Sequence, residues 1–181
     1  MTQEVQIIRC RRKSVGIRVT DGGEIIVRAP LRMPMAEIRR ILEDKRAWID
    51  KALARVRERE QQPKLTGDEV KALAREAKKV IPPRVSAWAR FAGISYGRIA
   101  IRKQRTRWGS CSAEGNLNFN CLLMLCPEPV MDYVIVHELC HRKELNHSPR
   151  FWAEVEKILP EYRQAKQWLK TEGQALIGRL G

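Results

Sequence analysis

The chain has 181 residues, enough for one domain or for one domain with a small appendage, and its 44% hydrophobic content is ordinary for a globular protein. No run of about 18 apolar residues is present, which excludes a membrane-spanning helix and a membrane partner, and the first residues lack the apolar run of a signal peptide. Five cysteines without a C-x-x-C pair argue against a disulfide framework or a cysteine-based zinc knuckle, so we expect a cytoplasmic protein with reduced thiols.

The net charge of +14 is unevenly distributed. Residues 1–60 hold 15 Lys+Arg against 9 Asp+Glu, residues 61–107 hold 12 against 3, and residues 108–181 hold 8 against 9. The basic residues 1–107 could therefore bind nucleic acid, nucleotides or acidic proteins, and a solvated face explains them equally well.

The N-terminal part is expected to form strands followed by a helix. Alternating and apolar patterns predict strands at 5–8, 15–19 and 24–28, with Asp21-Gly22-Gly23 as a hairpin turn. Apolar residues at steps of three and four predict one helix over 35–59, with Trp48 in the core. A short polar linker at 61–64 is the predicted boundary between an N-terminal subdomain, 1–62, and a larger domain, 63–181.

The larger domain is expected to open with a helix and a small antiparallel sheet. Thr66-Gly67-Asp68-Glu69 has the form of a capping box, and Pro82-Pro83 is expected to break the helix that it opens before a short helix at 88–91. Residues 94–124 predict the sheet, with Lys103, Arg105 and Arg107 alternating in one stretch. In another stretch Asn116, Asn118 and Asn120 alternate with apolar residues, which fits an edge strand that adds to a peptide, or simply a half-exposed strand.

The strongest signal is His137-Glu138-Leu139-Cys140-His141, an H-E-x-x-H motif that follows the apolar residues 133–136. Positions i and i+4 share one helical face, so two imidazoles at this spacing can bind one ion. Glu138 can then act as general base toward a water beside that ion. Such a motif arises by chance, but all three histidines of this chain lie within residues 137–147, which argues against coincidence.

Two residues compete to be the third ligand. His147 is expected in a tight turn after a helix end at Leu145-Asn146 and before a new helix with Ser148 as N-cap and Pro149 at its first position. Glu144 lies on nearly the same helical face as His137 and is ranked second, as a partner that orients a histidine. Three protein ligands with an open position are typical of catalytic zinc sites.

Two more helices are expected, over 149–159 and 161–170. Tyr162 could donate a phenol hydrogen bond to an oxyanion near the metal, although half-buried packing is the commoner role of such a residue.

Several separated blocks together resemble the YgjP-type metallopeptidase family, which is more distantly related to SprT-like and other zincin peptidases. The blocks are Thr106-Arg107-Trp108-Gly109-Ser110-Cys111-Ser112, Leu117-Asn118, residues 133–141, Asn146-His147-Ser148, Phe151-Trp152 and Pro160-Glu161-Tyr162. The resemblance implies an α+β fold: a zincin-like core in which a small antiparallel sheet packs on the H-E-x-x-H helix, preceded by an N-terminal β-hairpin and helix. It also implies His137, His141 and His147 as ligands and Glu138 as the base.

The leading hypothesis is a zinc peptidase acting on a peptide or protein, with Arg107, Asn118 and Tyr162 as candidate substrate-binding residues. Nickel, cobalt and iron also suit three imidazoles. One alternative is a metal-dependent hydrolase of nucleotides or other phosphorylated compounds, in which the basic row 103–107 holds phosphates. Another is a nucleic-acid-associated protease tethered by residues 1–107.

Overall fold

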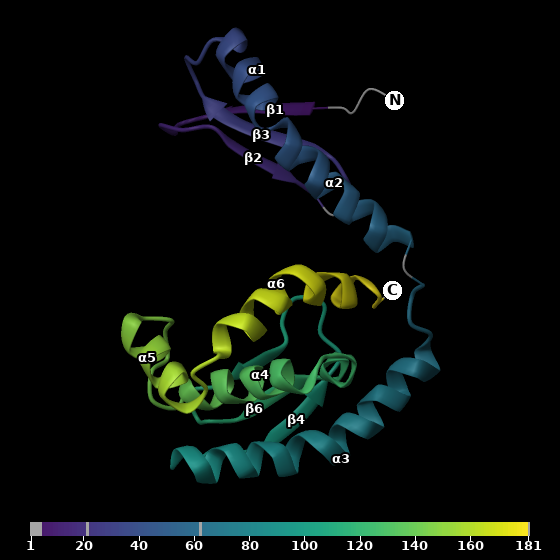
Figure 1. The fold of residues 1–181 in the computed structure, drawn as a ribbon, viewed down its shortest axis with the longest axis vertical. Coiled ribbons are helices and arrows are strands. Elements are labelled where there is room, and N and C mark those ends of the chain that lie inside the picture. The colour runs from purple at the N-terminus through teal and green to yellow at the C-terminus, as the bar shows by residue number, and fades with distance from the viewer. Residues whose placement is uncertain (1–4, 21, 62, 181) are drawn as a thin grey trace. The chain divides into compact units, whose positions relative to one another are not determined.

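The computed structural model describes residues 5–20, 22–61 and 63–180 and divides into two compact units (Figure 1). Unit 1 is Met1–Gln62 and unit 2 is Pro63–Gly181. Each unit has a hydrophobic cluster of its own. That 1–62 is an N-terminal subdomain and 63–181 a metallohydrolase domain stays a prediction.

Unit 1 contains a three-stranded sheet of order β1-β3-β2. β1 (Val5–Cys10) pairs parallel with β3 (Ile25–Pro30), whereas β2 (Gly16–Val19) pairs antiparallel with β3. Of the predicted turn, Asp21 lies outside the described residues, and Gly23 has a φ of 78°, a conformation that favours glycine. In the order β1-β3-β2, strand β2 is one edge of this sheet.

Two helices pack on the sheet face that carries the buried side chains of β3. They are α1 (Met35–Asp44) and α2 (Arg46–Gln61), where the sequence predicted one helix, and the break falls at Lys45, whose backbone leaves the helical region. The prediction that Trp48 lies in the core is wrong, because its side chain is 51% exposed. Ile49 and Leu53 occupy the inward face of α2, and Trp48, one position earlier, falls beside that face.

Unit 2 begins with α3 (Gly67–Ala92), which has the predicted capping box at Thr66 and Glu69. The prediction that Pro82-Pro83 breaks this helix is wrong, because α3 runs through both prolines without interruption. An interior proline costs about 3 kcal/mol. That cost is offset by packing, because one face of α3 stays buried on both sides of the prolines.

The second sheet has the order β4-β6-β5 and is mixed, which corrects the prediction of an antiparallel sheet. β4 (Ile99–Arg102) pairs parallel with β6 (Leu117–Asn120), and β5 (Gly109–Cys111) pairs antiparallel with it. The segment 103–108 carries the chain from one side of β6 to the other, which reverses the expected pairing. The asparagine-bearing strand β6 is thus central, and β5 is the edge.

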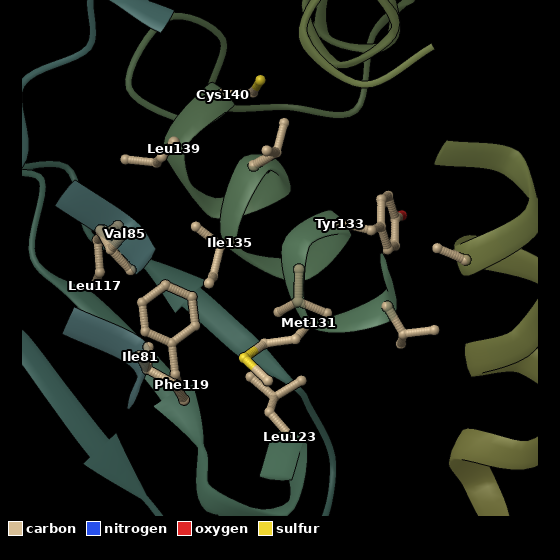
Figure 2. Close-up of a cluster of buried hydrophobic side chains, with 14 of the residues drawn as sticks. Ile81, Val85, Leu117, Phe119, Leu123, Met131, Tyr133, Ile135, Leu139 and Cys140 are labelled. Atoms are coloured by element: carbon tan, nitrogen blue, oxygen red, sulfur yellow. The ribbon is translucent and has the colours of Figure 1, made fainter. Parts of the chain in front are cut away.

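The core of unit 2 forms around α4 (Glu128–Cys140), which is apolar on nearly all sides. The short helix η1 (Cys121–Leu125) precedes it, and α5 (Pro149–Ile158) and α6 (Tyr162–Gly178) follow it. Figure 2 shows side chains of α3, β6 and η1 gathered against α4; among those labelled are Ile81, Val85, Leu117, Phe119, Leu123, Met131 and Ile135. α4 is therefore a rigid support for the residues in its last turn, 137–140, and for its C-cap residue, His141.

Among the helices described, none is both long enough and apolar enough to cross a bilayer.

Candidate metal centre and active site

The last turn and the end of α4 carry the H-E-x-x-H motif. His137 and Glu138 lie in its last turn, and His141 is its C-cap residue. The ring centroids of His137 and His141 are 4.9 Å apart, as expected for positions i and i+4. Because α4 is buried on most sides, these side chains are fixed relative to the core.

His147 returns to the same place from the loop between α4 and α5. α4 ends at Cys140, earlier than the predicted end at Leu145-Asn146, so the loop is longer than expected. Ser148 caps α5 by accepting a hydrogen bond from the Phe151 backbone N–H, with a proline at the start of the helix, as predicted. This cap directs the preceding residue, His147, back toward α4.

The three imidazoles converge. Nε2 of His147 lies 2.9 Å from Nε2 of His137. One ring nitrogen from each of His137, His141 and His147 lies within 4.8 Å of the others. Zn–N bonds of about 2.0–2.1 Å need nitrogens no more than about 4.2 Å apart, so small movements of the rings would bring all three onto one ion. Three neutral imidazoles are a donor set that zinc accepts, so the residues present fit a metal ion.

A buried phenylalanine supports all three rings. Phe151 of α5 is fully buried, and its ring centroid lies 4.8 Å from that of His137, 4.5 Å from His141 and 4.9 Å from His147. In the sequence, Phe151 was noted as part of the Phe151-Trp152 block of the family resemblance and was given no role at the metal site. Its contacts with the histidines depend on the packing of α5 against α4, so no local pattern revealed them.

The partner of His141 determines which of its nitrogens is free. Its Nδ1 lies 3.1 Å from the backbone carbonyl oxygen of Glu144. Because a carbonyl only accepts, Nδ1 must carry the proton, which leaves Nε2 as the ligand atom. Glu144 thus contacts the histidine through its main chain, whereas the sequence argument had considered its carboxylate.

Burial lowers the pKa values of two of these histidines, which keeps them neutral. The pKa of His137 falls to about 3, mainly because burial removes water from the ring and secondarily because His141 and His147 are near. The pKa of His141 is lowered as well, for the same main reason. Neutral imidazole is the form that binds a metal.

The carboxylate of Glu138 is buried beside the three histidines. Its side chain is 5% exposed, and burial raises its pKa to about 8, while the nearby charge of Arg107 acts in the opposite direction. A Cβ at Gly109 of β5 would lie only 2.7 Å from Cγ and Oε1 of Glu138. The carboxylate therefore fits against the edge strand only because position 109 has no side chain.

A pocket of about 220 Å³ adjoins His137 and Glu138. Its walls come from β5, α4 and α6 and are mostly apolar; the remaining lining residues are Trp108, Gly109, Tyr133, Val134 and Leu169. The indole N–H of Trp108 is buried, and no described group accepts a hydrogen bond from it.

The predicted substrate-binding residues lie in different surroundings. Arg107 is exposed and close enough to Glu138 to influence its charge. Asn118 is engaged within the sheet, because its Nδ2 donates to Ser110 Oγ at 3.2 Å and its Oδ1 accepts from Arg102 Nε at 3.4 Å. Tyr162 is 5% exposed and stacks on other rings.

One buried residue near Arg107 was assigned a different role by the sequence pattern. Asn120 was expected on a polar strand face, but it is fully buried and its Nδ2 donates to the carbonyl oxygens of Gln104 (2.7 Å) and Arg107 (3.0 Å). It therefore holds the segment that carries Arg107 toward Glu138.

Comparison with known proteins gives one family. The family model described as "YgjP-like, metallopeptidase domain" matches residues 13–72 and 69–172. No curated protein matches the chain.

The solved structures that are similar to part of the chain include two metallopeptidase zymogens. Abylysin of Pyrococcus abyssi is 24% identical with a TM-score of 0.49, over 52% of this chain and 96% of its own. Jannalysin of Methanocaldococcus jannaschii is 22% identical with a TM-score of 0.46, over 51% of this chain and 95% of its own.

Proposed function

The chain belongs to the YgjP-like metallopeptidase family, and from this we propose that it cleaves peptide bonds with a zinc ion held by His137, His141 and His147 and with Glu138 as general base. The observation that carries the proposal is the convergence of three ring nitrogens beside a buried carboxylate. The matched residues 69–172 include this whole cluster.

Zinc is the ion we propose because three neutral imidazoles with an open position are typical of catalytic zinc sites, although nickel, cobalt and iron accept the same ligands. A bound divalent ion supplies Lewis-acid chemistry, which acidifies water and polarises a carbonyl. The Glu144 carbonyl keeps His141 in the tautomer that leaves Nε2 free, and Phe151 holds the rings in place.

Glu138 takes a proton from the attacking water at its carboxylate and gives it to the leaving amine. Its burial favours proton uptake, which a base needs, while the positive charge of Arg107 acts in the opposite direction. Gly109 allows the carboxylate to sit against β5. Arg107, held by Asn120, is the residue that we propose contacts substrate next to this base.

We propose that the substrate lies along β5, the edge strand beside Glu138, and not along β6 as the asparagine pattern suggested. The adjoining pocket then takes one substrate side chain, and its apolar walls favour an apolar one. The asparagine amide at 118 already bonds within the sheet, so we assign it to supporting the strands.

We further infer a zincin-like core related to that of SprT-like peptidases, from the order of sheet, H-E-x-x-H helix and ligand-bearing loop. All five cysteines are free thiols, which supports a reducing compartment such as the cytoplasm. The family favours peptides over nucleotides as substrates.

The test is an unbiased peptide library incubated with zinc-loaded wild-type protein and with Glu138→Gln, with a nucleotide panel run in parallel. We expect the wild type to cleave peptides and the variant to retain zinc but lose cleavage. Cleavage by zinc-loaded Glu138→Gln would refute the base assignment. Turnover of nucleotides with no peptide cleaved would refute the proposed substrate class.

A further inference from the structure

A groove in unit 1 lies between α2 and the edge strand β2. Two hollows, of about 310 Å³ and about 190 Å³, lie along it, and Trp48 lines both of them. The first hollow is bounded by Val15 and Ile17, and the second by Val19 and Thr20. We call this the Trp48 groove, and it lies entirely within unit 1.

Along the β2 edge that borders the Trp48 groove, the backbone groups that face outward have no hydrogen-bond partner among the residues that the structure describes. The N–H of Thr20 donates to Glu24 O at 2.9 Å, so it points toward β3. In an antiparallel pair the direction alternates along the strand, so Arg18 also points toward β3, whereas Ile17 and Val19 point their N–H and C=O groups away from the sheet. A strand placed beside β2 would find these groups at hydrogen-bonding positions.

The spacing of the two hollows matches such a strand. Side chains two positions apart on one face of a strand are about 6.6 Å apart, since the rise is about 3.3 Å per residue. Ile17 and Val19 are two positions apart, and each lines a different hollow. Two alternate side chains of an added strand would therefore enter the two hollows, one on each side of Trp48.

The chemistry of the groove indicates what binds there. Its walls are largely aliphatic, and its charged lining residues are Lys45, Lys51 and Arg55, with no acid among the lining residues that the structure describes. In the described part of unit 1 these three cations have no ion pair. Nucleobases would leave their polar edges unpaired against aliphatic walls, whereas apolar side chains would not. Both the free backbone edge and these walls favour a peptide over a nucleic acid.

We propose that the Trp48 groove docks an extended peptide segment with apolar side chains at two alternate positions and acidic residues around them. The segment adds as a strand to β2, its apolar side chains pack on both sides of Trp48, and its carboxylates pair with the surrounding cations. The residues of this site all belong to unit 1, whereas the histidine cluster belongs to unit 2, and the ligand is recognised whether or not it is cleaved.

The test uses the full chain, treated with a chelator so that no peptide is cut, and a fluorescein-labelled peptide with two leucines separated by one residue and flanked by glutamates. Binding is measured by fluorescence polarisation for the wild type, Ile17→Pro, the matched Ile17→Val and Lys51→Glu. Proline removes the outward N–H of Ile17 and leaves the bonds to β3 in place. Circular dichroism and thermal melting verify that each variant is folded.

We expect Ile17→Pro and Lys51→Glu each to weaken binding at least about tenfold, and Ile17→Val to change it less than about twofold. Placing the two leucines side by side should weaken binding as well, because only alternate residues share one strand face. The Lys51→Glu effect should shrink at high salt.

Three results would overturn the proposal. One is no binding of the peptide at millimolar protein concentration, and another is binding that folded Ile17→Pro leaves unchanged. The third is tighter binding of oligothymidylate than of the peptide, with equal affinity for Ile17→Pro and the wild type. That result would make the groove a nucleic-acid surface. Because Lys51 is exposed, Lys51→Glu tests the proposal even if the proline variant does not fold.

Discussion

Gly109→Ala is the substitution that most directly tests how Glu138 is positioned. The added Cβ would lie 2.7 Å from both Cγ and Oε1 of Glu138, whereas ordinary contacts begin at 3.4 Å. One of the two groups must therefore move by about 0.7 Å. Glu138 is 5% exposed and has little room, so we expect its carboxylate to leave its working position.

A displacement of about 1 Å at a catalytic group can lower the rate about 10²-fold. We therefore expect kcat/KM of Gly109→Ala to fall about 30- to 100-fold, or about 2–3 kcal/mol of transition-state stabilisation. Zinc affinity should change little, because the three histidines are untouched. Gly178→Ala is the matched control, since a Cβ there meets nothing within 4 Å.

The assay measures kcat/KM on the best library peptide, zinc content after dialysis, and the melting temperature, for the wild type and both glycine variants. Loss of zinc together with loss of activity would show that the substitution disturbs the whole centre. Full activity in a folded, zinc-loaded Gly109→Ala protein would refute the argument that the close approach of β5 positions Glu138.

Three further predictions concern the metal ligands, the buried base and the support of α4. His147→Ala should lower zinc affinity greatly, because it removes a ligand. Glu144→Ala should lower it by less than the roughly 10–100-fold expected when an outer partner is removed, because Glu144 contacts His141 through its main chain, which the substitution keeps. Chelator competition measures both, and the reverse order would exclude the three-histidine site. In metal-free protein the raised pKa of Glu138 means that the folded state holds its proton more tightly than the unfolded state. The stability that this carboxyl contributes is then full below about pH 4.5 and is lost as pH rises through about 8, by an amount on the order of 5 kcal/mol. Glu138→Gln should therefore melt at a higher temperature than wild type at pH 9 but not at pH 5. Asp132→Ala should destabilise unit 2 by about 2–3 kcal/mol in urea unfolding, because its carboxylate accepts hydrogen bonds from Arg84 (2.5 and 3.0 Å) and from the indole of Trp88 (2.7 Å), both on α3. A loss below about 0.5 kcal/mol would show that this link between α3 and α4 contributes little.

The spacing of residues in the sequence was enough to predict the part of the site that lies on a single helix. Residues four apart on a helix share a face in any fold, so His137 and His141 were predictable as neighbours from their numbers alone. The Ser148-Pro149 start of α5 and the capping box at Thr66 are equally local, because each satisfies backbone N–H groups a few residues away. The family resemblance, which rests on several such blocks, is confirmed by the family model.

Contacts between distant segments were decided only by the tertiary structure. The approach of Gly109 to Glu138 joins residues 29 positions apart, and the choice between the Glu144 carboxylate and its carbonyl depends on where α4 ends. Whether a strand is central or at an edge, and whether β4 pairs parallel or antiparallel, depends on the path of segment 103–108 and not on any two-residue alternation. Pro82 stayed inside α3 because burial of that helix outweighed a local preference to end it. Periodicity states which residues share a face, but the free energy of packing that face against another segment decides what the face meets.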